Sequence, residues 1–442
     1  MTFVSFDPST GRVLAHHACL SGAGLEQSLA RAHAATEDWQ NVAPAERAAL
    51  LFRLASTLSA GRERLARELC LETGSLLADC LQEVARCAEE CAHFAAHGQA
   101  MLPSARSQLS QRPLGLMLAL TAGPAPLWQC FRVLVPALMA GNGLLLKPAE
   151  HLSGLVAVLA RLMTEAGVPE GLVTPLRISK EQVAGLVADS RIGGLAYSGE
   201  RRGGAAMAAL AGARLKPVRL ELARASVQLI LDDAELAPAV ESVLNDGFRY
   251  RASWRQSEGG VLITPGLAEP FLELLTARLE QLRPGRPDDM GVELGPLAKS
   301  GQREWLERQL REAERQGGRI RCGGYLPDDE DGWYYPATLI EGSEPAMTLF
   351  PAWPAGPLCG VLRVPDEAAM LALCRALSPD GMASIWTRDR ARGERLARAL
   401  PFDLCRVNPD PYHDRHWPPL SDPAQRPALK EFCRAKTVLI SA

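Results

Sequence analysis

Apolar and polar positions along the chain follow two distinct periods. Between Ala43 and His97 the apolar residues recur every three or four positions in a segment rich in Ala, Leu, Glu and Arg, which predicts two long amphipathic helices. A polar, alternating piece follows at about 107–112, and Leu114–Leu120 then reads as an apolar strand that Gly and Pro close. We expect this strand to leave one structural layer and to enter another.

From this strand onwards, apolar strands alternate with helices. The strands are predicted at Leu114–Leu120, Gly143–Lys147, Thr174–Ile178, Gly193–Ser198 and Pro217–Glu221, and the helices near 126–140, 151–166, 180–189 and 202–213. This alternation is typical of a parallel, doubly wound sheet. Such a sheet binds ligands beyond the carboxyl ends of its strands, so the residues just after each strand matter most for function.

A second α/β alternation begins near residue 226 and predicts a second domain. Its strands are expected at Val227–Leu231, Gly260–Thr264, Gly360–Val364 and Ala383–Trp386, and its helices near 236–247, 268–282, 300–316, 366–377 and 390–399. The tail from Pro401 has little pattern and closes with an apolar strand, Thr437–Ile440. Because that strand has no neighbour in sequence, it must pair with another part of the chain.

Composition narrows the class of protein. The 442 residues, 47% hydrophobic and 22% charged, are enough for two or three globular domains. The net charge of -3 gives no electrostatic reason to expect nucleic acid or an anionic membrane as partner. No stretch reaches the roughly 18 uninterrupted apolar residues of a membrane span, and the N-terminus does not resemble a signal peptide. We therefore expect a cytoplasmic protein, with little room before VSFDPSTG for an N-terminal hairpin.

The 11 cysteines are an odd number scattered through apolar helical segments, which suits a reducing compartment. Cys80, Cys87 and Cys91 recur at helical spacing and could present three sulfurs to a metal. Buried cysteine behaves as a small apolar residue, however, and no CxxC pair or second ligand group supports zinc. We assign no metal.

Four segments in the order of the chain resemble the aldehyde dehydrogenase superfamily. They are VLVPALMAGNGLLLKPAE (Val133–Glu150), AYSGERRGG (Ala196–Gly204), RLELARASV (Arg219–Val227) and GMASIWTRD (Gly381–Asp389). QRPALKEFCRA (Gln425–Ala435) and GERRGG are most similar to the N-succinylglutamate 5-semialdehyde dehydrogenase branch. The resemblance implies a doubly wound Rossmann-type cofactor domain, a second α/β catalytic domain and a small β bridging element for oligomerisation.

The resemblance divides the chain into three units. A dinucleotide-binding-type domain is expected over 1–104 and 113–222, a catalytic-type α/β domain over 223–420, and bridging strands over 105–112 and 421–442. Pairing between the two bridging segments covers an edge that is otherwise unpaired, which is a physical reason to expect a homodimer or higher homo-oligomer. A hetero-oligomer with an active relative is a further option.

The chemistry that the resemblance implies begins with the attack of a thiol on an aldehyde. Hydride transfer to NAD(P) and hydrolysis by a glutamate-activated water follow. Aligning GFRYRASWRQSEGGVLI (Gly247–Ile263) without a gap puts Arg255 where the family has its nucleophilic cysteine. Arginine has no lone pair to offer. Ser253 and Ser257 flank the position without a histidine base, and no cysteine lies between 131 and 321. Cys130 is the one thiol expected near the substrate tunnel of the family, and packing in the hydrophobic core is the better interpretation of this residue.

Two further catalytic positions can be compared. In AGPAP (Ala122–Pro126), Pro124 stands where the family's oxyanion asparagine is expected, and proline donates no hydrogen bond. Glu221 keeps the position of the glutamate that activates water. General-base and structural roles for Glu221 carry equal weight, because a carboxylate at a strand end also serves as a cap or an ion-pair partner.

The cofactor positions give a mixed answer. Lys147 and Glu150 match the family residues that hold the adenosine ribose. In the turn Gly199–Glu200, the glutamate stands at a helix N-terminus where it competes with the pyrophosphate, although Arg201 and Arg202 could offset its charge. In WPAGP (Trp353–Pro357), Trp353 replaces the carboxylate that holds the nicotinamide ribose. From these residues we expect no cofactor, or weakly bound NAD(P).

The preferred hypothesis from the sequence is therefore a pseudoenzyme that keeps the fold and serves as a scaffold, regulatory subunit or ligand-binding protein. The first alternative is an active NAD(P)-dependent semialdehyde or aldehyde oxidoreductase, or a hydrolase, with a rewired site that uses Glu221 together with Ser253, Ser257 or Cys130. In that case Arg255, with Arg249 and Arg251, could bind a substrate carboxylate, although a solvent-facing helix end explains these arginines at least as well. The second alternative is a non-catalytic nucleotide-binding module.

Overall fold

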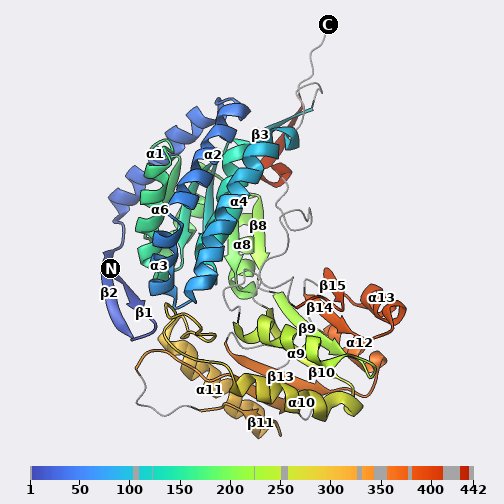
Figure 1. Cartoon of the computed structure of the whole chain (residues 1–442). Helices are drawn as coiled ribbons and strands as arrows, with labels where there is room; N and C mark the ends of the chain where they lie inside the picture. Colours follow the sequence, from blue (N-terminus) through green and yellow to red (C-terminus); the bar gives the residue numbers. More distant parts are fainter. Residues whose placement is uncertain are drawn as a thin grey trace.

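The computed structural model of the chain describes residues 2–102, 109–121, 123–222, 224–249, 257–325, 331–342, 356–376, 381–411 and 429–437. Two lobes are visible, each built on its own β-sheet with helices against the sheet faces (Figure 1). This arrangement confirms the predicted α/β fold class, with a parallel doubly wound sheet followed by a second α/β unit.

The first sheet has five parallel strands in the order β6-β5-β4-β7-β8. Its strands are β4 (Leu116–Thr121), β5 (Gly143–Pro148), β6 (Val173–Pro175), β7 (Ile192–Gly199) and β8 (Val218–Leu222). The helices that connect them are α5 (Pro126–Ala140), the short η1 (Glu150–Leu152), α6 (Ser153–Glu165), α7 (Lys180–Ala188) and α8 (Arg201–Gly212). Because the chain starts at the central β4 and winds first to one side and then to the other, the strand order reverses beside β4, which is where such sheets bind ligands.

Four helices precede this sheet, namely α1 (Gly22–Gln40), α2 (Pro44–Ala60), α3 (Arg62–Thr73) and α4 (Leu77–Met101). The segment predicted as two helices thus contains three. Gly61 separates α2 from α3, and Gly74 ends α3 in the left-handed conformation (φ 69°), which glycine adopts without strain. Periodicity alone could not locate these breaks, because the apolar spacing continues across them.

The N-terminal segment forms an antiparallel hairpin of β1 (Thr2–Asp7) and β2 (Arg12–Ala18). Its turn is held by Asp7, whose Oδ1 accepts hydrogen bonds from the Ser9 amide (2.8 Å) and hydroxyl (2.6 Å). The sequence VSFDPSTG, before which little room for a hairpin was expected, is therefore itself one arm and the turn of a hairpin. The Asp-Pro-Ser-Thr-Gly stretch is a turn signal that points to this outcome.

The second sheet has seven strands in the order β11-β12-β13-β10-β9-β14-β15. They are β9 (Arg224–Ile230), β10 (Ser257–Ile263), β11 (Arg319–Cys322), β12 (Thr338–Gly342), β13 (Leu358–Arg363), β14 (Met382–Trp386) and β15 (Leu404–Val407). The accompanying helices are α9 (Leu236–Leu244), the π-helix η2 (Asn245–Arg249), α10 (Pro265–Glu280), α11 (Ser300–Arg315), α12 (Glu367–Ala376) and α13 (Arg390–Ala399). Within the described strands, β11 runs antiparallel to β12 and the other neighbours are parallel.

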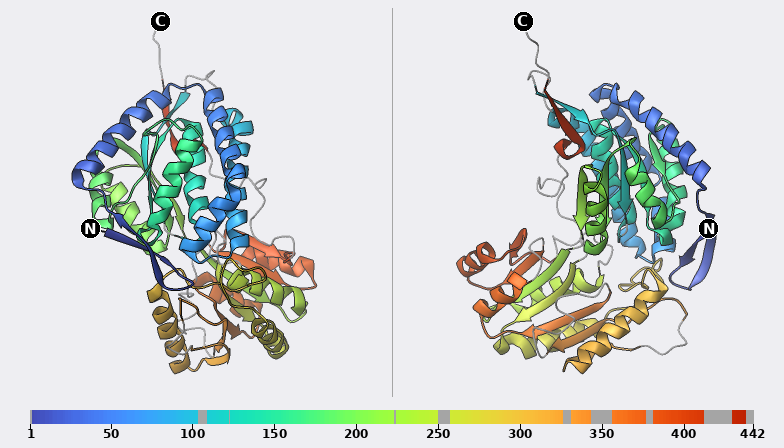
Figure 2. Two further views of the ribbon diagram at one scale, coloured as in Figure 1. Left: turned by 60° about the vertical axis from the view of Figure 1, so that its left-hand side comes forward. Right: turned by 180° about the vertical axis from the view of Figure 1, so that it is seen from behind.

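A further two-stranded sheet joins distant parts of the chain. Strand β3 (Leu109–Pro113) pairs antiparallel with β16 (Cys433–Thr437), which follows the short turn η4 (Leu429–Phe432). Figure 2 shows this ribbon extending from the end of the first lobe. Pairing of the C-terminal strand with the piece before residue 114 is the pairing that the family resemblance implies, although β16 begins earlier and residues 438–442 lie outside the described part. The domain boundaries stay predictions.

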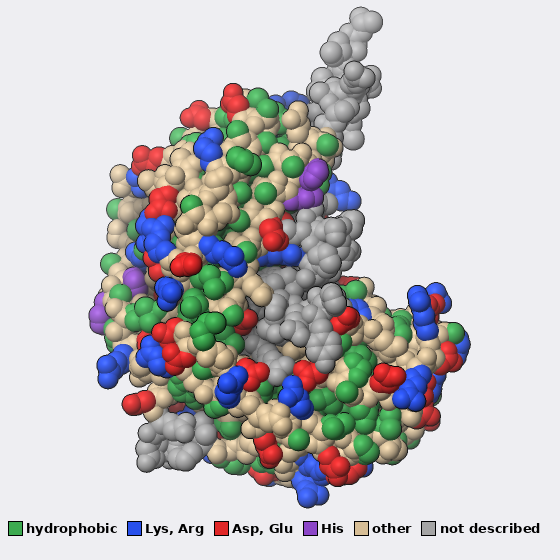
Figure 3. All heavy atoms as spheres, viewed as in Figure 1, with side chains coloured by type: hydrophobic (Ala, Val, Ile, Leu, Met, Phe, Trp, Pro, Cys, Tyr) green, Lys and Arg blue, Asp and Glu red, His purple; other side chains and the backbone are tan. Residues whose placement is uncertain are grey.

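The visible surface carries acidic and basic side chains interspersed with one another (Figure 3). In the part of the chain that the structure describes, no helix has the length and apolar content that crossing a bilayer requires. Likewise, among these residues no group of three or more His, Cys, Asp and Glu side chains is arranged to hold a metal ion.

Candidate active site

The carboxyl ends of β4, β5 and β7 meet at one edge of the first sheet. Leu120 of β4 lies opposite Lys147 of β5, and Thr121 lies opposite Ser198 of β7. Parallel pairing thereby brings the residues after these strands together, although they are far apart in sequence. The predicted cofactor residues on β5 and β7 therefore lie beside the strand-order reversal.

Lys147 and Glu150 lie close together at the end of β5. The Lys147 side chain is buried, and its Nζ donates to the Pro148 carbonyl at 3.4 Å. Burial lowers the pKa of Lys147, an effect that the nearby Glu150 carboxylate opposes. Glu150 Oε1 accepts a hydrogen bond from the Lys180 amide (3.0 Å) at the start of α7. A buried cation with one long hydrogen bond to a neighbouring carbonyl suits an additional polar ligand.

The N-terminus of α8 faces the same edge. Gly199 ends β7, and Glu200 is the N-cap residue of α8, but its side chain makes no capping hydrogen bond. The first turn contains Gly203, where a Cβ atom would lie 2.0 Å from Tyr197 Oη, so only glycine fits without displacing that ring. The amides at this helix end are thus not taken by the exposed Glu200 carboxylate and suit an anionic group such as a phosphate.

Glu221 on β8 is held between two arginines. Arg132 of α5 donates from Nη2 to Oε1 (2.8 Å) and from Nε to Oε2 (2.9 Å), and Arg219 Nη2 also donates to Oε1. The exposed fractions of the side chains are 7% for Arg132, 15% for Glu221 and 13% for Arg219. Burial alone would raise the pKa of Glu221, but the attraction of the two guanidinium groups exceeds it and lowers this pKa to about 2. Glu221 is therefore a counter-ion here and not a ready base.

Arg132 was not singled out from the sequence. It is a single charged residue in α5, PLWQCFRVLVPALMA, which is buried along its whole length. A lone cation in an otherwise apolar helix requires an anionic partner, and this is the signal that points to it. Arg132 also lies over the ring of Trp128, 5.7 Å from its centroid, and Arg86 of α4 lies 5.6 Å from the same centroid.

The C-terminal turn η4 contacts this cluster through Arg219. Arg219 Nη1 donates to Glu431, and its guanidinium lies 5.5 Å from the centroid of the Phe432 ring. The Phe432 carbonyl in turn accepts from Asn142 Nδ2 (3.0 Å) and from the Leu114 amide (3.2 Å). Residues near the end of the chain thus support the strand that carries Glu221.

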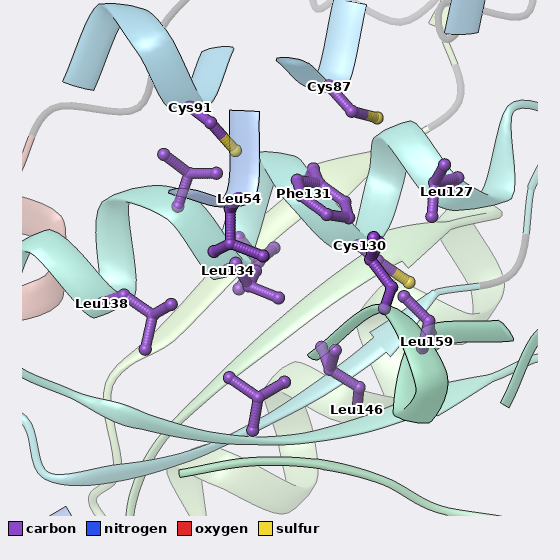
Figure 4. Packing of buried hydrophobic residues seen from close by; sticks show 14 of the residues in the cluster. Leu54, Cys87, Cys91, Leu127, Cys130, Phe131, Leu134, Leu138, Leu146 and Leu159 are labelled. Atoms are coloured by element: carbon purple, nitrogen blue, oxygen red, sulfur yellow. The ribbon is translucent and has the colours of Figure 1, made fainter. Parts of the chain in front are cut away.

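Cys130 does not serve as an accessible thiol in this structure. It is fully buried, packs with Leu127, Phe131 and Leu159 among others (Figure 4), and its Sγ lies 3.5 Å from Thr121 Oγ1. Burial raises the pKa of Cys130 to about 12, so the thiol stays protonated at neutral pH. Cys80, Cys87 and Cys91 lie in the same core, as expected for small apolar residues.

The turn before α5 contains Pro124, the position predicted for the oxyanion donor. The Pro124 carbonyl accepts from Gln129 Nε2 (2.9 Å), and Ala125 adopts a left-handed conformation with φ of 52°. Ala125 offers no capping side chain, and Glu83 of α4 takes that role, with Oε1 accepting from the Trp128 amide at 3.0 Å. A carboxylate from another helix therefore holds the start of α5.

Several predicted site residues cannot be placed. Arg255, Ser253 and Arg251 fall in 250–256, and Trp353 falls in 343–355, both outside the described residues. Arg249 closes the π-helix η2, and Ser257 begins β10. The predicted roles of these residues stay predictions.

Comparison with known proteins shows matches over most of the chain. The sequence profile described as aldehyde dehydrogenase family matches residues 1–418. The NAD(P)+ succinate semialdehyde dehydrogenase Sad of Escherichia coli K12 is 31% identical over 404 residues, 90% of this chain and 87% of that protein. The NADP(+) succinate-semialdehyde dehydrogenase 1 of Mycobacterium tuberculosis H37Rv is 27% identical over 458 residues and 100% of both chains.

A solved structure shows that the fold is shared. Succinic semialdehyde dehydrogenase from Streptococcus pyogenes, crystallised with NADP+, matches with a TM-score of 0.90 and 23% identity, covering 100% of both chains. At this identity the likeness concerns the fold, including both lobes.

These relatives correct three predictions. The preferred hypothesis of a catalytically inactive protein is wrong, because proteins that match nearly the whole chain are named as dehydrogenases. The prediction of no cofactor or weakly bound NAD(P) is also wrong, since the same relatives are named for NAD(P)+ or NADP+. The similarity to the N-succinylglutamate branch is not supported, because these relatives are succinate semialdehyde dehydrogenases. The inactive-protein hypothesis rested on single positions predicted to differ from the family, among them Arg255 and Trp353, whereas the match extends over nearly the whole chain.

Proposed function

Because the chain belongs to the aldehyde dehydrogenase family, we propose that it is an NAD(P)-dependent dehydrogenase that oxidises a semialdehyde to the corresponding acid. The observation that carries this proposal is the 31% identity to Sad over 90% of the chain. The substrate class follows from the same relatives, and succinate semialdehyde is the substrate to test first. This proposal replaces the hypothesis of an inactive scaffold and keeps Glu221 as the candidate catalytic base.

The first sheet supplies residues that fit a dinucleotide. Lys147 and Glu150 at the end of β5 would hold the adenosine ribose, and the amides at the start of α8 would receive the pyrophosphate. The support for this assignment is the buried Lys147 ammonium group and the helix end that the Glu200 side chain does not cap, which lie at the same edge of the sheet. When bound, the cofactor would supply the hydride acceptor.

The proposed chemistry does not require a thiol between Cys130 and Cys322, where the sequence has none. An aldehyde hydrate already carries both oxygens of the acid. Its oxidation needs a hydride acceptor and a base for one hydroxyl proton, but no covalent nucleophile. We propose that Glu221 accepts this proton after its ion pairs with Arg132 and Arg219 have been broken.

The test is turnover by the purified protein. Succinate semialdehyde with NAD+ or NADP+ should give an increase in the absorbance of the reduced nicotinamide. The Glu221→Gln variant should have a kcat lower by about 100-fold or more, as expected for the loss of a general base. Glu241→Gln, which removes a carboxylate that pairs with Arg278 in the second lobe, is the matched control. Absence of turnover with either cofactor, across a panel that includes succinylglutamate semialdehyde, would refute the proposal.

We also propose that the chain assembles as a homodimer or higher homo-oligomer through the β3–β16 ribbon. Among the described strands, each of these two has one neighbour, which leaves an edge able to accept a further strand. Light scattering of the purified protein would show a mass of two or more chains. A single-chain mass at micromolar concentration would contradict this assignment.

A further inference from the structure

The ion pair around Glu221 leads to an inference about specificity, which rests on the proposed function. We propose that the carboxylate of an acidic substrate displaces Glu221 from Arg132 and Arg219, and that the substrate thereby releases the base that its own oxidation requires. A neutral aldehyde carries no such group and leaves Glu221 bound.

The exchange is chemically balanced. A substrate carboxylate is the same functional group as the Glu221 side chain, and the planar fork of Arg132, which now binds both Glu221 oxygens, suits either of them. Removing Glu221 without a replacement would leave two largely buried cations facing each other, which is costly. Replacing it with another carboxylate keeps the charge of the pair unchanged, so substrate and Glu221 compete on similar terms.

The two arginines are fixed by contacts that do not involve Glu221. Arg132 lies against the Trp128 ring on the buried helix α5. Arg219 is held by Glu431 and by the Phe432 ring. The described hydrogen bonds of the Glu221 carboxylate, by contrast, all go to these two arginines. When a competing carboxylate arrives, the arginines therefore stay in place and the glutamate is the group that moves.

Release changes the acid–base character of Glu221. Among the residues that the structure describes, the charged groups that face it are Arg132 from α5 and Arg219 from its own strand, with Glu431 of η4 behind Arg219. Once the guanidinium groups are occupied by the substrate, their attraction no longer holds Glu221 ionised, while burial, which favours the protonated form, remains. The freed carboxylate can then take a proton, which the paired one does not.

The first experiment uses a neutral aldehyde and adds the missing carboxylate separately. Butanal has the chain length of succinate semialdehyde without its acid group. We expect butanal to be oxidised at least about tenfold more slowly at saturation, and acetate at tens of millimolar to raise its turnover several-fold, whereas chloride at equal ionic strength should not. Arg219→Gln should abolish the acetate effect, and Arg86→Gln, which lies on the same Trp128 ring without a described contact to Glu221, should keep it.

The second experiment does not depend on turnover. Infrared difference spectra of the protein minus Glu221→Gln isolate the carboxylate band of this residue, which is then titrated with and without saturating succinate. We expect succinate to shift the titration of Glu221 upward by about one unit or more, since it removes an attracting charge. Glu241→Gln difference spectra, taken in the same way, should show no shift with succinate.

The outcomes separate the two proposals. If no aldehyde is oxidised but succinate shifts the titration, the proposed function fails and the displacement stands. If succinate semialdehyde is oxidised while acetate leaves butanal turnover unchanged or inhibits it, and succinate leaves the Glu221 titration where it was, the displacement is overturned and the function stands.

Discussion

The carboxylate that caps α5 gives a prediction whose size can be worked out from the structure. Glu83 is 1% exposed and accepts hydrogen bonds from the backbone amides of Trp128 and Leu127, in the first turn of α5. Burial raises the pKa of Glu83 from 4.5 to about 7, and the two backbone hydrogen bonds oppose but do not cancel this shift. The folded protein therefore binds this proton more tightly than the unfolded chain does.

The sign of the effect follows from linkage. Because the folded-state pKa lies above the unfolded value, the contribution of Glu83 to stability is fully present below pH 4.5 and is lost as the pH rises to about 7. A shift of about 2.5 units corresponds to about 3 kcal/mol of unfolding free energy. Glu83→Gln keeps an oxygen that can accept the amide hydrogen bonds but cannot ionise. The unfolding free energy of this variant should therefore not fall for this reason between pH 4.5 and pH 7.

The assay is urea unfolding of the protein and of Glu83→Gln between pH 5 and pH 8, followed by circular dichroism. The variant should gain stability relative to the parent by up to about 3 kcal/mol as the pH rises. Asp79 lies one turn away, and its pKa is raised by burial and by the charge of Glu83. Glu83→Gln removes that charge, so its effect through Asp79 also increases stability at neutral pH. Glu89→Gln, 59% exposed on the same helix, controls for the loss of a charge. Parallel stability curves for the parent and Glu83→Gln would refute the reasoning.

Three further predictions concern single side chains. Cys130→Ala should keep turnover with succinate semialdehyde and lower the unfolding free energy by about 1–2 kcal/mol, because the thiol packs in the core; loss of turnover in a folded variant would contradict this. Lys147→Ala should weaken NAD(P) binding about tenfold to a hundredfold, measured by quenching of tryptophan fluorescence, as expected for a charged hydrogen bond; an unchanged dissociation constant would exclude Lys147 from the site. Gly193→Ala should destabilise the first lobe by about 1–3 kcal/mol in thermal unfolding, because the new Cβ would lie 1.9 Å from the Leu114 carbonyl oxygen; wild-type stability would show that the strands shift freely.

Much of the fold could be predicted from the sequence, because parallel strands buried on both faces appear as short apolar runs. Leu116–Thr121 and Gly143–Pro148 are buried at every position, and both were recognised within two residues. In the second sheet, strands β11, β12 and β15 were missed. Strand β12 is mostly buried, but it has only two aliphatic residues, Leu339 and Ile340, which is too short a run to be recognised. Strands β11 and β15 have only partly buried or exposed positions, so their composition does not differ enough from that of a loop.

The candidate site was predictable only in part. Lys147, Glu150, Glu200 and Glu221 were proposed from the resemblance to the family's motifs, and they lie where strands end or helices begin, which is where this fold concentrates ligand-binding groups. The ion pairing and low pKa of Glu221 could not be predicted from the sequence, because they depend on Arg132, which is 89 residues away in sequence. The cap that Glu83 gives to α5 is equally invisible from sequence, since local capping rules consider only neighbouring residues, and Ala125 satisfies none of them.

The docking of η4 affects the order in which the chain folds during synthesis. Asn142 Nδ2 donates to the Phe432 carbonyl, across 290 positions of sequence. As the ribosome extends the chain from the N-terminus, the first lobe emerges long before its partner turn exists. The contacts of η4 with Asn142, Leu114 and Arg219 therefore form only after translation has passed both lobes. A truncated product that ends before residue 429 would have the first lobe without these contacts.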